Sequence, residues 1–144
     1  MPFVGGGGSL PLGGPGTWVS ETVGNPAARA FQARATNVAE GWAYRVENAA
    51  GAHNFDGVTR YGNDFVLLDA KSDYSFLLRS DGRLQPWART TFTEDVAKVA
   101  SQVQIANGVP IEYLVGNEGT RAYWQLVFDQ AGAGEDLLRI GVAP

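Results

Sequence analysis

Cysteine is absent from this chain, and histidine occurs once, as His53. Without cysteine there is no disulfide framework, no thiolate metal site and no thiol nucleophile. A single histidine also excludes zinc sites built from several histidines, and we interpret His53 as a loop residue. No apolar run has the roughly 20 residues that a membrane-spanning helix needs, so no membrane partner is expected. The first eight residues lack the basic and then apolar pattern of a signal peptide.

Positive charge is also scarce. The 144 residues carry 11 basic and 15 acidic side chains, a formal net charge of −4. This balance argues against broad electrostatic binding to nucleic acid, which needs a basic surface. Most of the basic residues nevertheless precede residue 100. A locally basic cleft in that part of the chain therefore stays compatible with the composition.

Glycine and proline are concentrated at the amino end. Residues 1–24 contain the runs Gly5 to Gly8 and Gly13 to Gly16, the second interrupted by Pro15. Such a composition cannot bury enough apolar surface to order itself, and it predicts a flexible linker. The remaining residues, 25–144, are enough for one domain with a sizeable core.

Hydrophobic periodicity and capping residues divide this domain into alternating elements. We expect helices over residues 25–36, 93–107 and 117–131, and strands over residues 42–47, 54–60, 65–71, 110–115 and 137–142. Asn25, Thr93 and Asn117 are the expected helix caps. The order predicts an α/β fold, in which a mixed central sheet is flanked by helices.

One hairpin is the most informative segment. Residues 65–71 form a β-rich apolar run, typical of a strand buried on both faces. Residues 54–60 form a second, weaker strand. Gly62 and Asn63 lie between the two runs, and this pair favours a tight two-residue turn. A turn at these two residues fixes how the strands pair.

That register brings together two acids and a lysine. Asp56 would lie directly opposite Asp69, and Lys71 would project from the same face of the sheet. Opposed carboxylates repel each other unless one is protonated or a cation lies between them. A divalent cation with oxygen ligands meets this need, and a lysine beside it can orient a water or neutralise phosphate charge. Alternatively, Asp56 is a strand-end residue and the Asp69–Lys71 segment runs out into solvent.

Short sequence motifs spread along the chain support the interpretation of Asp56, Asp69 and Lys71 as a cation site. They are Phe31 to Thr36, Phe55-Asp56-Gly57, Leu67 to Lys71, Gln102-Val103-Gln104, and Gly108 to Tyr113. On these residues the chain resembles the PD-(D/E)xK superfamily of restriction-endonuclease-like proteins. It looks most like the fifth class of restriction-endonuclease-fold toxin domains, found at the carboxyl ends of bacterial polymorphic toxins and type VI secretion effectors. Asp69 stands where this family more often has glutamate, and Tyr113 where it often has tryptophan.

The resemblance implies a restriction-endonuclease-like αβββαβ core and a role for each site residue. Asp56 and Asp69 would ligate Mg²⁺ or Mn²⁺ together with the carbonyl of Ala70, and Lys71 would position the attacking water. Three glutamines and a tyrosine are auxiliary candidates. Gln32 would extend from the first helix toward the site, Gln102 or Gln104 would line the substrate channel, and Tyr74 would pack against a base or fill the core.

The same resemblance implies a metal-dependent DNase toxin that hydrolyses phosphodiester bonds; the sequence does not distinguish DNA from RNA. It would be a secreted effector acting in the cytoplasm of a competitor bacterium. Its partners would be a cognate immunity protein and a delivery protein or upstream domain joined through the glycine-rich segment. Two alternatives stay open: a catalytically inactive restriction-endonuclease-like fold that binds nucleic acid or protein, and a structural domain of a larger secreted protein.

Overall fold

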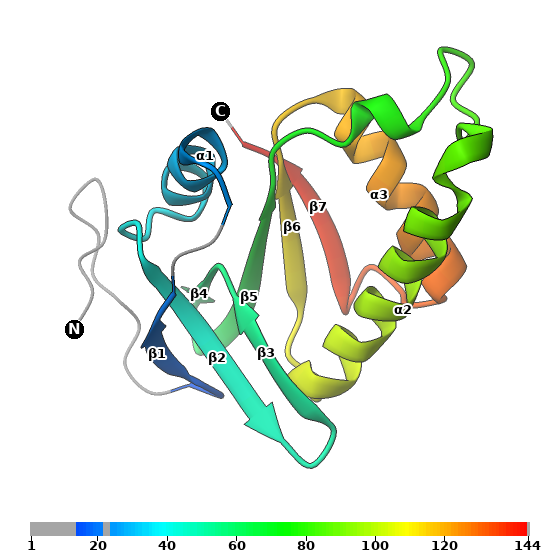
Figure 1. Ribbon diagram of the computed structural model, residues 1–144. Coiled ribbons are helices and arrows are strands. Elements are labelled where there is room, and N and C mark those ends of the chain that lie inside the picture. The colour runs from blue at the N-terminus through cyan, green and yellow to red at the C-terminus, as the bar shows by residue number, and fades with distance from the viewer. Residues whose placement is uncertain (1–13, 22–23, 144) are drawn as a thin grey trace.

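The computed structural model describes residues 14–21 and 24–143, which form an α/β arrangement of three α-helices and two sheets (Figure 1). In chain order the elements are β1 (Thr17–Ser20), α1 (Pro26–Thr36), β2 (Trp42–Asn48), β3 (Gly51–Phe55), β4 (Gly57–Tyr61), β5 (Asp64–Lys71), the one-turn helices η2 (Ser75–Leu77) and η3 (Pro86–Ala88), α2 (Arg89–Ala106), β6 (Ile111–Val115), α3 (Glu118–Ala131) and β7 (Leu138–Val142). Within these residues no helix combines the length and apolar character needed to cross a bilayer.

The two sheets differ in strand direction. Strands β1, β2 and β3 form an antiparallel sheet in that order. Strands β4 to β7 form a mixed sheet, in which β4 and β5 are antiparallel whereas β5, β6 and β7 are parallel. Parallel neighbours need long crossover connections, and α2 and α3 provide them. The strand β5 therefore has neighbours on both edges and joins the antiparallel part of this sheet to the parallel part.

Helices cover both faces of the mixed sheet. Helix α1 packs near β5 on one side, and α2 with α3 lies on the other (Figure 1). Alternation along β5 follows this division, because Leu67 joins the core beneath α2 and α3. The core also contains Tyr44 and Phe55 from the antiparallel sheet and Tyr113 from β6, so a single apolar interior connects both sheets.

The helix ends follow from local chemistry. The side chain of Asn25 accepts a hydrogen bond from the Ala28 N–H group, and that of Asn117 accepts one from Thr120. Both are the expected amino-terminal caps. Gly132 ends α3 in the left-handed conformation (φ 78°), which glycine adopts without steric cost.

The predicted start of α2 at Thr93 is wrong. The helix begins at Arg89, directly after η3, and its first residue is preceded by Ala88, which makes no side-chain cap. Pro86 starts this earlier turn because its fixed backbone angle suits the first position of a helix. The one-turn helix η3, rather than a capping side chain, determines where α2 begins.

Two predicted boundaries near the antiparallel sheet are also corrected. Residues 17–20, assigned to the linker, form β1 and pair with β2, from Thr17 opposite Arg45 to Ser20 opposite Trp42. Residues 1–13 and 22–23 of the predicted linker lie outside the described residues. The single strand predicted over residues 54–60 is instead two, β3 and β4, which belong to different sheets and meet at Asp56.

Candidate functional site

The hairpin of β4 and β5 has the predicted register. Gly62 and Asn63 form the turn, Tyr61 pairs with Asp64, and the ladder continues to Gly57 opposite Leu68. Gly62 has a φ of 65°, a conformation that suits glycine in such a turn. The turn therefore determines which residues of β5 lie nearest to Asp56.

The ladder ends at Asp56, so the expected direct strand pair of Asp56 with Asp69 does not form. Instead the Asp56 N–H group donates to the Leu68 carbonyl (2.9 Å), and its carboxylate accepts from the Ala70 N–H group (2.7 Å). The side chain thus replaces the missing strand partner of Ala70. This contact still holds the Asp56 carboxylate beside Asp69 on β5.

The glycine that follows Asp56 has a packing reason. A Cβ atom at Gly57 would lie 3.3 Å from Cβ of Thr36 and 3.4 Å from Cγ2 of Val38. A larger residue would push the strand away from α1 and the loop after it. In the Phe55-Asp56-Gly57 motif, Phe55 is buried in the core, Asp56 supplies a carboxyl group, and Gly57 lets the strand pack closely against Thr36 and Val38.

Asp69 and Lys71 form a close ion pair on the face of β5 beneath α2 and α3. The Lys71 Nζ atom lies 3.0 Å from Oδ1 of Asp69 and stands over the rings of Tyr113 and Trp124, 5.2 and 5.3 Å from their centroids. Asp69 is 4% exposed, whereas Lys71 is partly exposed. The lysine therefore connects a buried carboxylate with the surface.

The environment shifts the pKa values of the Asp56 and Asp69 carboxyl groups in opposite directions. Burial, the neighbouring Asp69 charge and a hydrogen bond to Asp69 raise the pKa of Asp56 well above its usual range, against the opposing Ala70 hydrogen bond. Burial alone would also raise the pKa of Asp69, but the Lys71 charge and the hydrogen bonds with His53, Lys71 and Asp56 together outweigh it and lower that pKa to about 2. The Lys71 pKa is raised because attraction to Asp69 exceeds the effect of burial. These shifts favour an ionised Asp69, an Asp56 carboxyl that retains its proton, and a charged Lys71.

Gln102 of α2 fixes the other side of Asp69. Its Oε1 accepts a hydrogen bond from the Tyr113 hydroxyl (2.7 Å), which turns Nε2 toward Asp69 Oδ2 (3.5 Å) and His53 Nε2 (3.3 Å). An amide nitrogen only donates, and Asp69 Oδ2 is an acceptor within its reach. The network ties α2, β3, β5 and β6 together around one carboxylate.

Tyr113→Phe tests this network. Without the hydroxyl, Oε1 of buried Gln102 loses its donor, and we expect the free energy of unfolding to fall by about 1–3 kcal/mol. Urea denaturation measures the change, with Tyr61→Phe as the control because Tyr61 is exposed at the hairpin turn. An unchanged midpoint for Tyr113→Phe would contradict a structural role for this hydrogen bond.

Of the remaining predicted site residues, some lie beside Asp56 and Asp69 and others do not. The carbonyl of Ala70 points toward the same strand edge as its N–H group, which is the Asp56 side. Tyr74 packs into the core, stacked on Tyr123 and edge-on to Trp124. Gln104 is exposed, on the far side of α2 from Gln102. Gln32 faces a shallow hollow between α1 and the loop at residues 38–41, and no described contact joins it to Asp56 or Asp69.

His53 belongs to the site, although its sequence context indicated only a loop. It lies on β3, and its Nε2 atom is 3.8 Å from Oδ2 of Asp69. Its ring packs edge-on against buried Phe55. The alternation of residues along a strand places His53 and Phe55 on one face, but that signal is readable only once residues 51–55 are known to be a strand.

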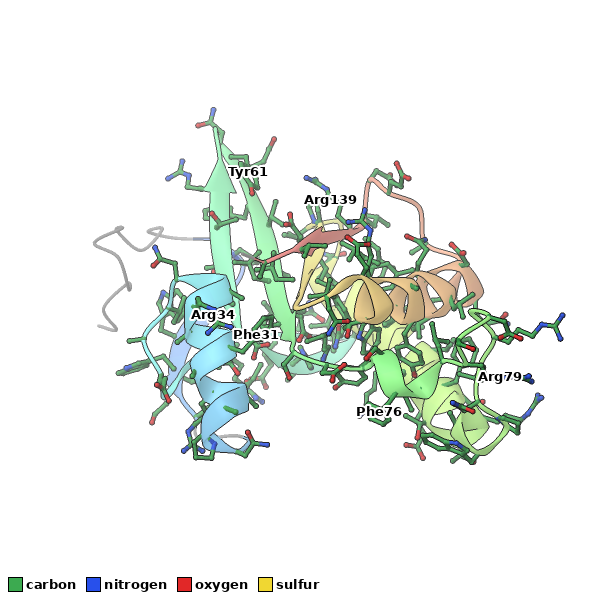
Figure 2. The ribbon with its side chains drawn as sticks, turned by 90° about the horizontal axis from the view of Figure 1, so that it is seen from above. Phe31, Arg34, Tyr61, Phe76, Arg79 and Arg139 are labelled. Atoms are coloured by element: carbon green, nitrogen blue, oxygen red, sulfur yellow. The ribbon has the colours of Figure 1, made fainter. Side chains whose placement is uncertain are left out.

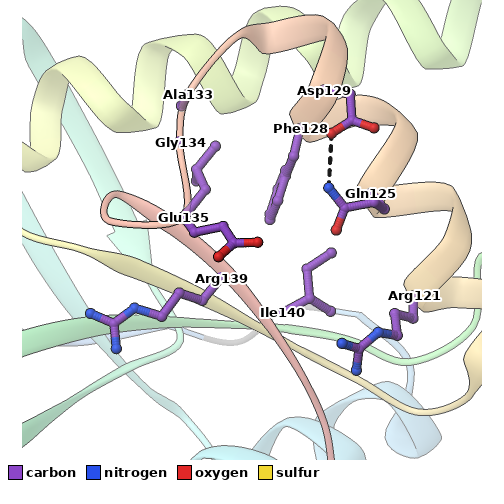
Figure 3. A pocket seen from close by; sticks show the side chains of 10 residues that line it. Arg121, Gln125, Phe128, Asp129, Ala133, Gly134, Glu135, Arg139 and Ile140 are labelled. Carbon is purple, nitrogen blue, oxygen red and sulfur yellow. Dashed lines mark hydrogen bonds between the residues drawn. The ribbon is translucent and has the colours of Figure 1, made fainter.

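A separate hollow of about 470 Å³ lies between α3 and β7 (Figure 3). It contains Arg121, Arg139 and Glu135, and its wall is crossed by a hydrogen bond from Gln125 to Asp129 (2.9 Å). None of the residues around Asp69 lines it. Its lining carries both signs of charge, and Asp56, Asp69 and Lys71 lie outside it.

Comparison with known proteins adds no assignment. No protein-family model matches the chain, and no curated protein or solved structure is detectably similar to it.

Proposed function

We propose that this chain is a metal-dependent nuclease with a restriction-endonuclease-like core. The observation that carries the proposal is the convergence of two neighbouring carboxyl groups, Asp56 and Asp69, with the Lys71 ammonium 3.0 Å from Asp69. The antiparallel β4–β5 pair, followed by a helix and the parallel strand β6, is consistent with the last part of an αβββαβ order. Nothing else among the described residues combines paired acids with a partly buried cation.

The carboxyl pair fits a divalent cation. Two adjacent carboxylates, both largely removed from water, are mutually destabilising when both are ionised, and the raised pKa of Asp56 reflects this. Among the described residues there is no group of three or more histidine, cysteine or acidic side chains suited to a metal. Two carboxyl groups, Asp56 and Asp69, would instead hold Mg²⁺ or Mn²⁺ together with the Ala70 carbonyl, with water and substrate phosphate as the other ligands. When bound, such a cation lowers the pKa of a water and offsets phosphate charge.

Lys71 acts in this scheme as a charged donor rather than as a base. Its raised pKa keeps the ammonium protonated at neutral pH. One N–H bond is directed to Asp69, and the remaining donors are free to orient a water or to stabilise negative charge that develops on a phosphate. The Tyr113 and Trp124 rings restrict the lysine to this position.

The other site residues hold the geometry. Gln102 orients Asp69 through its amide and is itself oriented by Tyr113. His53 lies beside the same carboxylate, with its Nε2 atom 3.8 Å from Asp69 Oδ2, and is partly exposed. We assign Tyr74 to core packing beneath the segment that follows β5.

The biological setting that we propose follows from the sequence resemblance. The domain would act as a DNase toxin in the cytoplasm of a competitor bacterium, after delivery by a secretion system through an upstream protein. A cognate immunity protein would protect the producing cell. Because the chain is acidic overall, with a net charge of −4, the immunity protein would either fill a locally basic cleft or distort the site from another surface.

Metal-dependent cleavage of plasmid DNA tests the proposal. We expect the purified protein to convert supercoiled plasmid to nicked or linear forms with Mg²⁺ or Mn²⁺. Excess EDTA should stop the reaction, and renewed cation should restore it. Plasmid and bacterial RNA are tested in parallel to identify the substrate.

Either of two results would contradict the proposal: cleavage that persists unchanged in EDTA, or a folded protein that cleaves neither DNA nor RNA with either cation. The second result, combined with retained nucleic-acid binding, would favour the inactive binding module.

A further inference from the structure

Two large aromatic side chains are stacked in the open on the segment between β5 and α2. Phe76 of η2 and Trp87 of η3 are 58% and 62% exposed. Their ring centroids are 6.3 Å apart and their planes differ by 12°. Neither ring belongs to the hydrophobic core or packs against it as a partly buried residue. Folding therefore does not explain their position, and exposed apolar groups held together indicate a binding surface.

The ring geometry suits a planar ligand. Nearly parallel rings that are more than half exposed leave a flat aromatic face to which a further ring can be added. Single-stranded nucleic acids bind proteins in this way, because every base has an aromatic face.

The local charge suits the same ligand. Residues 72–89, from the end of β5 to the first residue of α2, contain three arginines, Arg79, Arg83 and Arg89, and two acids, Asp73 and Asp81, although acidic residues outnumber basic ones in the whole chain. All three arginines are exposed. Asp81 accepts a hydrogen bond from the Arg83 N–H group (3.0 Å), and its contacts with the Arg79 and Arg83 guanidinium groups are long and exposed, at 3.7 and 3.9 Å, so solvent screens them strongly. The segment thus provides cations for phosphates beside the aromatic faces.

The aromatic pair also lies within reach of the candidate active site. Phe76 is five residues beyond Lys71, so their Cα atoms are at most about 18 Å apart. Tyr74, between them in sequence, packs against Trp124, and the Lys71 ammonium stands over that same indole. In Figure 2, Phe76 and Arg79 project from the side of the molecule that carries α2 and α3, far from Tyr61 at the hairpin tip. A strand of a few nucleotides would span from the acids to this pair.

We infer that Phe76 and Trp87 form a stacking platform for the bases of a single-stranded nucleic-acid segment, with the three arginines binding its phosphates. The inference rests on the proposed function, since it gives the nuclease a preference for unpaired or locally melted substrate. A protein partner would also use aromatic and arginine side chains. The local excess of cations on an acidic chain and the parallel, open rings favour nucleic acid.

Binding without cleavage tests this platform. A short fluorescein-labelled DNA single strand is titrated with protein in EDTA, and anisotropy gives the Kd. We expect Trp87→Ala and Phe76→Ala each to raise the Kd by about 5- to 100-fold, since stacking contributes about 1–3 kcal/mol per base. Tyr61→Ala is the matched control, because Tyr61 is equally exposed (58%) but lies at the hairpin turn. Circular dichroism and urea denaturation should show that all three variants fold like the wild type.

An abasic strand of equal length separates stacking from charge. It should bind wild type and Trp87→Ala alike, whereas Arg79→Gln should weaken the binding of both strands and reduce its salt dependence. Unchanged affinity of Phe76→Ala and Trp87→Ala for the normal strand would overturn the inference and assign the pair to a protein contact. If the pair is required for binding but the protein never cleaves, the proposed function fails and the platform stands. If cleavage is metal-dependent but binding does not need the pair, only the platform fails.

Discussion

Lys71→Ala is expected to slow metal-dependent cleavage of plasmid DNA by about a hundredfold to a thousandfold, the usual effect of losing one charged donor from a reaction centre. The structure gives the reason, because Lys71 Nζ lies 3.0 Å from Asp69 Oδ1 and stands over the Tyr113 and Trp124 rings. Time courses of plasmid nicking with saturating Mg²⁺ measure the effect. In cells, expression of the wild type should cause loss of chromosomal DNA, and expression of the variant should not.

Lys98→Ala is the matched control, because Lys98 is the other lysine of the chain and is exposed on α2. It should cleave like the wild type. Lys71→Ala leaves the Asp69 charge without its counter-ion, so its folding is checked by circular dichroism at the assay temperature. Cleavage by folded Lys71→Ala at the wild-type rate would remove Lys71 from the mechanism.

The second large effect concerns stability. Asp69→Asn is expected to lower the free energy of unfolding by about 3–5 kcal/mol, because it leaves the Lys71 ammonium partly buried without an opposite charge. In the absence of cations, Asp56→Asn should instead raise the free energy of unfolding, by up to about 1 kcal/mol. It removes the cost of keeping Asp56 protonated beside ionised Asp69, while the asparagine carbonyl still accepts from the Ala70 N–H group. Urea denaturation in EDTA at neutral pH compares both variants with the wild type, and equal effects of the two would contradict the charge assignment.

The pKa shifts give this prediction a pH dependence. The folded state holds the Asp56 proton more tightly than the unfolded chain, so metal-free wild type loses stability as pH rises from about 4 through the raised pKa. Asp69 acts in the opposite direction, because its lowered pKa contributes stability that is lost as pH falls from about 4 toward about 2. Asp56→Asn should abolish only the first loss. Mg²⁺ should stabilise the wild type at neutral pH and leave Asp56→Asn nearly unaffected, because ligand binding stabilises only the state that binds it.

The hairpin could be predicted in detail because its determinants are local. Gly62 and Asn63 fix a tight turn, and the period of a strand then decides which side chains share a face with Asp69. The caps Asn25 and Asn117 were predictable for the same reason, since each side chain bonds a backbone group three residues away. Sequence reasoning succeeded where a residue acts on its near neighbours.

The rest depends on contacts that are distant in sequence. No local signal shows that the chain leaves one sheet and enters another at Asp56, because the bend is stabilised by Leu68 and Ala70 of the next strand. Gln102 and Gln104 looked equivalent, and only the docking of α2 buries the first and exposes the second. His53 is the single histidine and precedes the strand predicted over residues 54–60, so the sequence indicates a loop, whereas its partners Asp69 and Gln102 define its position in the fold.

The position of Asp56 between the two sheets has a mechanical consequence. Its backbone continues directly from β3 of one sheet, whereas its carboxylate is bonded to Ala70 of the other. A small hinge movement between the sheets would therefore separate the two acids without altering any residue of the site. The distance between the Asp56 and Asp69 carboxyl groups therefore depends on how the antiparallel sheet of β1, β2 and β3 lies against the mixed sheet.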